Sequence, residues 1–199
     1  MRARELNVAG AFEFTSRTFP DERGLFASPY EEKGFAEAVG HPLFPVAQAS
    51  HSVSRRGVVR GVHVTAVPPG QAQYVYCVGG RAVDIIVDTR VGSPTYGRTD
   101  SVVLGGDDCR AVYYPVGVGH AFVALEDDTV IFYLLSTGHD PENEFALSPM
   151  DTALALPLPK DMDLLLSERD TKAMTLAEAE RCRALPEYAA CRAAEAAWR

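Results

Sequence analysis

One apolar stretch combines a titratable side chain with a permanent positive charge. The run Gly57–Thr65 places His63 three residues after Arg60, among valines and glycines. Histidine exchanges protons near neutral pH and is the commonest general base in enzymes, while the arginine guanidinium matches phosphate oxygens in pairs. The stretch therefore predicts proton abstraction beside an anion-binding group. A structural histidine and a surface arginine are the alternative interpretation.

Four more side chains elsewhere in the chain extend this chemistry. They are His120 after a glycine-rich turn, Tyr133 on an apolar run, Asp170 just before a predicted helix, and Arg23 in a charged turn. Asp170 would fix the ring of His63 by accepting a hydrogen bond, and Tyr133 facing a histidine would donate a proton. Each also has a simpler interpretation, as a core histidine, a core tyrosine, a solvated loop acid or a surface charge.

A metal site is the main alternative use of a histidine in this position. Two histidines spaced H-x-H on one strand point to the same face, where they can hold a metal together. The residue two places after His63 is Thr65, so the second imidazole is missing. We therefore expect a site without metal or other cofactor.

The elements that must position these residues are mainly β-strands. Short β-branched and aromatic runs follow one another from about residue 10 to residue 135, separated by glycine, proline, aspartate and serine. This pattern is typical of a sandwich or barrel rather than of strands alternating with helices. The clearest predicted strands are 58–65, 73–78, 82–88, 99–104, 111–114 and 129–135.

Helices are expected near the two ends of the chain. The predicted segments are 30–39, 176–185, which begins with a Thr-x-x-Glu capping box, and 186–198, which begins with a proline in its first turn. We expect a single domain over residues 1–199, with a helical C-terminal extension from about residue 175.

Composition narrows the class of protein. The formal net charge of −8 opposes nucleic-acid binding, because phosphate binding needs a basic surface. No run approaches the ~20 apolar residues of a membrane span, and the first residues lack the apolar segment of a signal peptide, so we expect a cytoplasmic protein with no membrane partner. Four widely spaced cysteines without a C-x-x-C motif favour free thiols over a zinc site or disulfides.

Five motifs occur in order along the chain. They are Asp-Glu-Arg-Gly-Leu-Phe at 21–26, Val-Val-Arg-Gly-Val-His at 58–63, Val-Asp-Thr-Arg-Val-Gly-Ser-Pro-Thr-Tyr-Gly at 87–97, Pro-Val-Gly-Val-Gly-His-Ala-Phe at 115–122 and Ser-Glu-Arg-Asp at 167–170. Together they resemble the dTDP-4-dehydrorhamnose 3,5-epimerase family, over about residues 1 to 175. The resemblance implies a metal-free, mainly β, cupin-type (jelly-roll) β-barrel that is usually a homodimer and acts on a dTDP-sugar.

The resemblance also implies a mechanism and a set of site residues. A 4-keto group makes the hydrogens at C3 and C5 acidic, a histidine backed by an aspartate removes one as an enolate forms, and a tyrosine returns a proton from the opposite face. By position, His63 resembles the base, Asp170 its partner and Tyr133 the acid. The residues implied to bind substrate are Arg23, Phe26, Gln48, Arg60, Gln73, His120, His139, Glu144 and Arg169, with Arg23 and Arg60 at the diphosphate.

Several positions depart from the family pattern. Gln73 stands where the 3,5-epimerases carry a lysine that steadies the C4 oxyanion, and loss of one oxyanion donor costs ~10²–10³ in rate in other enzymes. Ser28 replaces a glutamate, Ser50 an asparagine and His139 a tyrosine. The leading hypothesis is a specialised epimerase acting at C3 or C5 of a deoxysugar for a natural product. The alternatives are the housekeeping 3,5-epimerase of rhamnose synthesis and a noncatalytic sugar-nucleotide-binding cupin.

Overall fold

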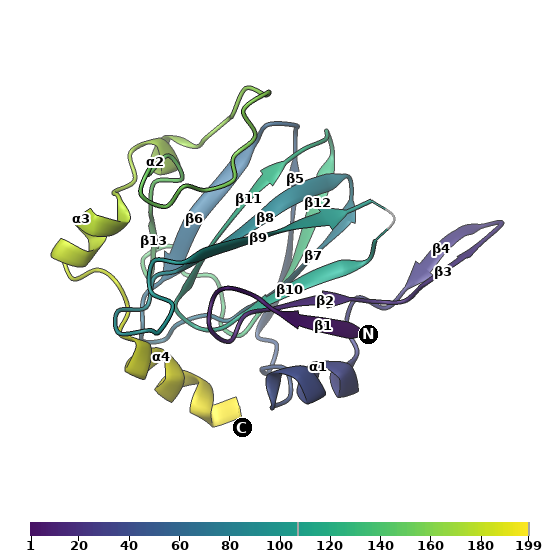
Figure 1. Ribbon diagram of the computed structural model, residues 1–199, viewed down its shortest axis with the longest axis horizontal. Helices are drawn as coiled ribbons and strands as arrows, with labels where there is room; N and C mark the ends of the chain where they lie inside the picture. Colours follow the sequence, from purple (N-terminus) through teal and green to yellow (C-terminus); the bar gives the residue numbers. More distant parts are fainter. Residues whose placement is uncertain (107, 199) are drawn as a thin grey trace.

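The computed structural model describes residues 1–106 and 108–198, and its strands form two facing antiparallel sheets and a separate hairpin (Figure 1). The six-stranded sheet has the order β1 (Arg2–Glu5), β2 (Phe12–Thr15), β10 (Arg110–Tyr114), β7 (Gln73–Gly79), β12 (Thr129–Leu135), β5 (Gln48–Ser54). The five-stranded sheet has the order β13 (Glu144–Ala146), β6 (Val59–Thr65), β11 (Val118–Ala124), β8 (Arg81–Asp88), β9 (Thr99–Gly105). The hairpin pairs β3 (Thr18–Asp21) with β4 (Gly24–Ala27).

The space between the two sheets is apolar at one end and polar at the other. Val75 of β7 and Ile131 of β12 are fully buried and belong to one core cluster with Ile86 of the opposite sheet. Side chains two residues apart on a strand share a face, so Gln73 and Tyr133 face the same interior as these core residues. The strands thus carry a hydrophobic core that continues into a polar site.

Helices and coil cover the outer faces of both sheets. Outside the six-stranded sheet, Phe35 of α1 (Glu32–Val39) and Cys191 of α4 (Tyr188–Glu195) pack with Phe14, Tyr74 and Tyr113. The segment from residue 147 to residue 185 packs on the five-stranded sheet and includes α2 (Glu168–Thr171) and α3 (Leu176–Arg181). A short 3-10 helix, Ala196–Trp198, follows α4. These layers fix the position of α2 relative to the five-stranded sheet.

The mainly β, jelly-roll prediction is confirmed, and the six predicted strands are present with no end shifted by more than one residue. The predicted capping box is present at Thr175 and Glu178, but the helix it starts ends at Arg181 rather than at residue 185. The first helix begins two residues later than predicted. Among the described residues, no helix has the length and hydrophobicity that crossing a membrane requires.

Candidate active site

A β-bulge in β6 brings Arg60 and His63 to the same face. In a regular strand, residues three apart point to opposite sides of the sheet. Here Arg60 pairs with Phe122 of β11 and His63 pairs with His120, so two residues of β6 stand opposite one residue of β11. The extra residue restores the alternation. The arginine and the histidine of the apolar stretch therefore both reach the space between the sheets.

His63 forms a hydrogen-bonded pair with Asp170. Its Nε2 lies 2.8 Å from Oδ1 of Asp170, a residue only 2% exposed. Asp170 is held in the first turn of α2, where its backbone N–H donates to the hydroxyl of the N-cap Ser167. Burial raises the pKa of Asp170, but the hydrogen bond and charge of His63 outweigh it, so that pKa lies below its ordinary value. The ionised carboxylate accepts from Nε2, which leaves Nδ1 of His63 free to take a proton.

Tyr133 lies on the opposite sheet from this pair. Its hydroxyl is 3.2 Å from Oγ of Ser52 on the neighbouring strand β5, and its ring makes an edge contact with the ring of His120. Burial raises the pKa of Tyr133, although the hydrogen bond with Ser52 lowers it, and the net pKa is above the ordinary value. The phenol thus stays protonated at neutral pH and can serve as a proton donor.

A second histidine–aspartate pair lies beside the first. Nε2 of His120 is 2.6 Å from Oδ1 of Asp84 on β8, and both residues are buried. The His120 ring stacks on Tyr114 with centroids 4.8 Å apart, and the Tyr114 hydroxyl is buried without a hydrogen-bond partner among the described residues. These contacts hold the imidazole of His120 against the inner wall of the site, in register with His63.

A cavity of about 380 Å³ joins these groups. It is lined by nine of the predicted site residues: Gln48, Arg60, His63, Gln73, His120, Tyr133, His139, Glu144 and Arg169. Asp170 lies behind His63 rather than in this lining. The structure therefore gathers ten of the twelve predicted site residues in one place, from both sheets and from α2.

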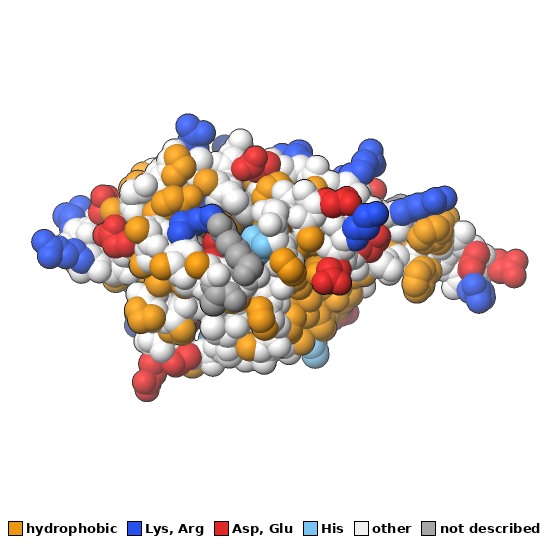
Figure 2. All heavy atoms as spheres, turned by 90° about the horizontal axis from the view of Figure 1, so that it is seen from below, with side chains coloured by type: hydrophobic (Ala, Val, Ile, Leu, Met, Phe, Trp, Pro, Cys, Tyr) orange, Lys and Arg blue, Asp and Glu red, His pale blue; other side chains and the backbone are white. Residues whose placement is uncertain are grey.

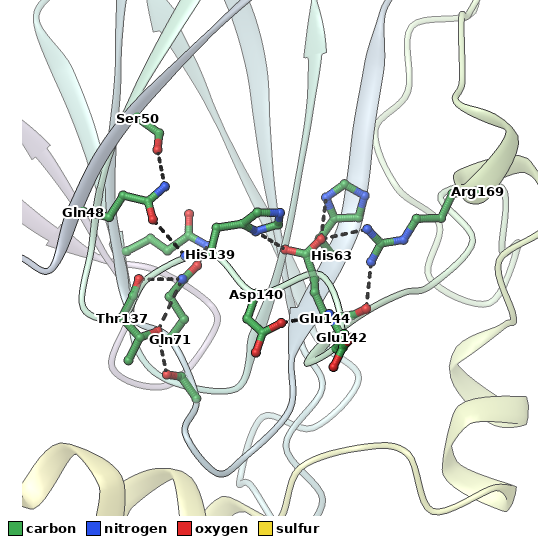
Figure 3. Close-up of polar contacts among 12 residues, drawn as sticks. Gln48, Ser50, His63, Gln71, Thr137, His139, Asp140, Glu142, Glu144 and Arg169 are labelled. Atoms are coloured by element: carbon green, nitrogen blue, oxygen red, sulfur yellow. Dashed lines mark hydrogen bonds and ion pairs between the residues drawn. The ribbon is translucent and has the colours of Figure 1, made fainter.

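Glu144 is the central acceptor at one side of the cavity (Figure 3). Its Oε1 accepts a hydrogen bond from Arg169 at 2.9 Å and lies 3.9 Å from Nδ1 of His63, while its Oε2 lies 3.7 Å from Nδ1 of His139. The backbone N–H of His139 donates to Gln48, whose amide in turn donates to Ser50. The three positions where the sequence departs from the family at this side, Ser50, Gln73 and His139, thus all belong to the lining.

Two predicted site residues lie outside this cavity. Arg23 and Phe26 belong to the β3–β4 hairpin, which extends away from the two sheets (Figure 1). Phe26 is 68% exposed, and Arg23 forms an ion pair with Asp21 of the same hairpin. Neither side chain contributes to the cavity of its own chain.

Three polar contacts of the site involve residues that were not among the predicted ones. Asp84 pairs with His120, Ser52 contacts the Tyr133 hydroxyl, and Gln71 binds the amide of Gln73. Asp84 had a visible signal, since it is a single acid in the middle of an apolar strand and buried acids need a partner. Gln71 had one too, because it precedes Gln73 by two residues and so shares its face.

The described residues contain no group of three or more His, Cys, Asp or Glu side chains arranged to hold a metal ion. Two imidazoles of the site are hydrogen-bonded to carboxylates, His63 to Asp170 and His120 to Asp84. Such pairs suit proton transfer, because the carboxylate fixes the tautomer and balances the charge that the imidazole acquires.

Comparison with known proteins agrees with this chemistry. Residues 5–178 match the family model described as dTDP-4-dehydrorhamnose 3,5-epimerase. The enzyme of that name from Mycolicibacterium smegmatis is 47% identical over 193 residues, covering 97% of this chain and 94% of the relative.

Two solved structures share the fold. NovW, a 4-keto-6-deoxy sugar epimerase from the novobiocin biosynthetic gene cluster of Streptomyces spheroides, has a TM-score of 0.91 at 48% identity and covers 96% of this chain and 95% of its own. ChmJ, a 3'-monoepimerase from Streptomyces bikiniensis in complex with dTDP-quinovose, has a TM-score of 0.90 at 42% identity, with 96% of each chain covered. The chain therefore belongs to the dTDP-4-dehydrorhamnose 3,5-epimerase family.

Proposed function

We propose that this protein inverts C3, C5 or both of a dTDP-4-keto-6-deoxyhexose, and that it is a specialised epimerase for a natural-product deoxysugar. The observation that carries the proposal is the arrangement of a histidine of one sheet, paired with an aspartate of α2, and a partly buried, protonated tyrosine of the other sheet, across one cavity. Groups on opposite walls can act on opposite faces of one carbon, which is what inversion requires.

The proposed reaction is a two-step proton exchange. Nδ1 of His63 takes the proton from the carbon next to the ketone, and the electron pair of the broken C–H bond moves to the C4 oxygen as an enolate. Tyr133 then donates its phenolic proton to the other face of the same carbon, and the C4 carbonyl re-forms. Exchange with solvent returns a proton to Tyr133 and removes one from His63. Asp170 stabilises the imidazolium during the step, because its carboxylate stays ionised.

The diphosphate is assigned to the arginines of the cavity. Arg60 and Arg169 both line it, and Arg169 is paired with Glu144 at 2.9 Å. A diphosphate offers oxygens that match a guanidinium in pairs, so it would compete with Glu144 for Arg169. Gln48, His139 and the other lining residues are assigned to the sugar and the nucleoside.

Gln73 supports a specialised substrate. It lines the cavity as a neutral amide where the family's double epimerases carry a cation. The relatives differ in the number of carbons they are named for, since the Mycolicibacterium smegmatis enzyme is named for epimerisation at two carbons and ChmJ for one. A weaker oxyanion donor suits a substrate that needs a single inversion, which disfavours the housekeeping rhamnose pathway.

A homodimer is part of the proposal, because the described residues of the chain leave the apolar surface of the hairpin exposed. Hydrophobic side chains lie along the projecting arm, between its charged tip and the body of the molecule (Figure 2), with Leu25 52% and Phe26 68% exposed. An isolated two-stranded hairpin is marginally stable in water, and a clustered apolar surface marks an interaction site. We place Arg23 and Phe26 at the cavity of a second copy. A cytoplasmic location is also proposed, in keeping with four free cysteines.

Solvent exchange tests the function directly. The protein is incubated in D₂O with dTDP-4-keto-6-deoxyglucose, and NMR follows deuterium at C3 and C5. Exchange at one carbon supports the specialised enzyme, and exchange at both carbons supports the double epimerase. Binding without exchange at either carbon would support the noncatalytic alternative and contradict the proposal.

Two histidine variants calibrate the experiment. His63→Ala should abolish the exchange, because it removes the base. His51→Ala removes an exposed histidine of β5 that does not line the cavity, and it should exchange at the wild-type rate. If His63→Ala still exchanged at that rate, the base would be another residue.

A further inference from the structure

Two glutamine side chains of the cavity wall and one backbone carbonyl form a hydrogen-bonded chain. Nε2 of Gln73 donates to Oε1 of Gln71 at 2.8 Å, and Nε2 of Gln71 donates to the backbone oxygen of Thr137 at 3.0 Å. Gln71 is only 6% exposed, and both glutamines line the cavity. Thr137 follows β12, so the chain links the start of β7 to the end of the strand that carries Tyr133.

This chain leaves only one orientation for each amide. A backbone carbonyl can accept but cannot donate, so Gln71 must turn its NH₂ group toward Thr137 and its oxygen toward Gln73. Gln73 must then present its own NH₂ group to that oxygen. Among the described residues this is the only hydrogen bond of the Gln73 amide, so one of its N–H groups remains for the cavity.

We propose that Gln71 is a positioning residue, which holds the amide of Gln73 with its N–H directed at the C4 oxygen of the substrate. The proposal rests on the proposed function, since it needs an enolate oxygen in this cavity. Gln71 itself does not touch the reacting carbon. Its part is to exclude the reversed orientation, in which the carbonyl oxygen of Gln73 would face the developing oxyanion and repel it.

An amide needs such a partner, whereas a lysine does not. A glutamine amide has a donor end and an acceptor end of nearly equal shape, and a half-turn exchanges them. A lysine ammonium carries three donors and no acceptor, so every rotation presents an N–H. The replacement of the family lysine by Gln73 therefore makes the orientation of this group dependent on Gln71. Preorganised donors of this kind commonly contribute ~10²–10³ in rate.

A double-substitution experiment separates positioning from a merely structural role. Gln71→Met keeps the length and volume of the side chain but removes both hydrogen bonds. In the native background it should lower kcat for deuterium exchange by about 10-fold or more, with KM changed by less than about 3-fold. In a Gln73→Lys background the same substitution should lower kcat by less than about 3-fold. A structural role of Gln71 would cost the same in both backgrounds, and that result would overturn the proposal.

A second apolar variant and the wild type complete the test. Gln71→Leu also removes both hydrogen bonds and adds no charge, so its loss of kcat should again be about 10-fold or more in the native background and less than about 3-fold in the Gln73→Lys background; equal losses in the two backgrounds would contradict the orientation argument. It also serves if Gln71→Met fails to fold, which circular dichroism detects. Wild-type protein that shows no exchange at all would refute the proposed function instead, and exchange unaffected by either substitution would refute the positioning role alone.

Discussion

The chemistry of the site depends on which nitrogen of His63 carries the proton. Asp170 is ionised and accepts from Nε2 at 2.8 Å, so Nδ1 is the basic atom. An asparagine at this position neither balances the charge of the imidazolium nor fixes the tautomer. Asp170→Asn should therefore lower kcat for exchange by about 10²-fold or more, measured by NMR in D₂O. Asp163→Asn, at an exposed position of the preceding coil, should retain wild-type activity, and equal losses in the two variants would contradict the role of the pair.

Removing the proton donor should separate exchange from inversion. Tyr133→Phe leaves His63 and Asp170 in place, so the proton is still abstracted and deuterium still enters from the face of His63. Delivery to the other face loses its donor, and formation of the inverted sugar should fall by about 10²-fold while exchange with retention continues. NMR distinguishes the two products. Tyr96→Phe is the control, because the Tyr96 hydroxyl donates to Glu180 outside the cavity. Equal losses of exchange and inversion would assign Tyr133 another role.

At the scale of the residue, side chains that carry out chemistry were predictable from the sequence. The side chains that hydrogen-bond to them were harder to predict. His63, Asp170 and Tyr133 are named by motifs and by the type of chemistry they perform. Asp84 acts through a contact with His120 of another strand, and no local pattern states which side chains meet across two strands. Gln71 contacts Gln73 two residues later, so local spacing did indicate this pair. The alternation rule narrows the choice to one face, but pairing between strands decides the partner.

At the scale of the element, the bulge in β6 determines that Arg60 and His63 both face the cavity. Gly61 has a φ of +101°, and a Cβ there would overlap the backbone oxygen of His120. Gly61→Ala should lower the free energy of unfolding by about 2 kcal/mol or more and lower kcat, since it displaces both Arg60 and His63. Denaturant unfolding and the exchange assay measure the two effects.

Gly92 provides the matched control for the bulge. It also has a positive φ, of +83°, but nothing lies within 4 Å of a Cβ built on it. Gly92→Ala should cost about 1 kcal/mol of stability and leave kcat unchanged. If Gly61→Ala behaved in the same way, the close approach of β6 and β11 would not be needed for the site.

The bulge also shows a limit of predicting side-chain directions from the residues of one strand alone. Residues 58–65 predict a strand correctly, but a regular strand places Arg60 and His63 on opposite faces. The glycine is compatible with a bulge and does not require one, because glycine also occurs in turns and at close contacts. The bulge is set by the pairing register of β6 with β11, and that register depends on residues about 60 positions away in the sequence.

At the scale of the whole molecule, the fold class was predictable and the strand order was not. Short strands separated by turn residues indicate a mainly β fold, and the structure has them in two sheets. Neighbours such as β2 and β10, or β6 and β11, are distant in sequence, so their pairing is set by packing of the whole chain. The projecting hairpin belongs to the same scale, since its exposed apolar side chains are the surface that the proposed dimer would cover.

Subunit mixing tests whether the hairpin serves a neighbouring cavity. Arg23→Ala and His63→Ala should each be nearly inactive alone. In a dimer whose hairpins reach across, a mixed pair has one cavity with both His63 and the partner's intact Arg23, so co-expression of the two variants should restore activity at about a quarter of all sites. If each hairpin served its own cavity, every site in the mixture would lack one group and no activity would return. Mixing His63→Ala with Asp170→Asn is the control, because these two residues pair within one chain and their mixture should recover no more than the residual activity of Asp170→Asn.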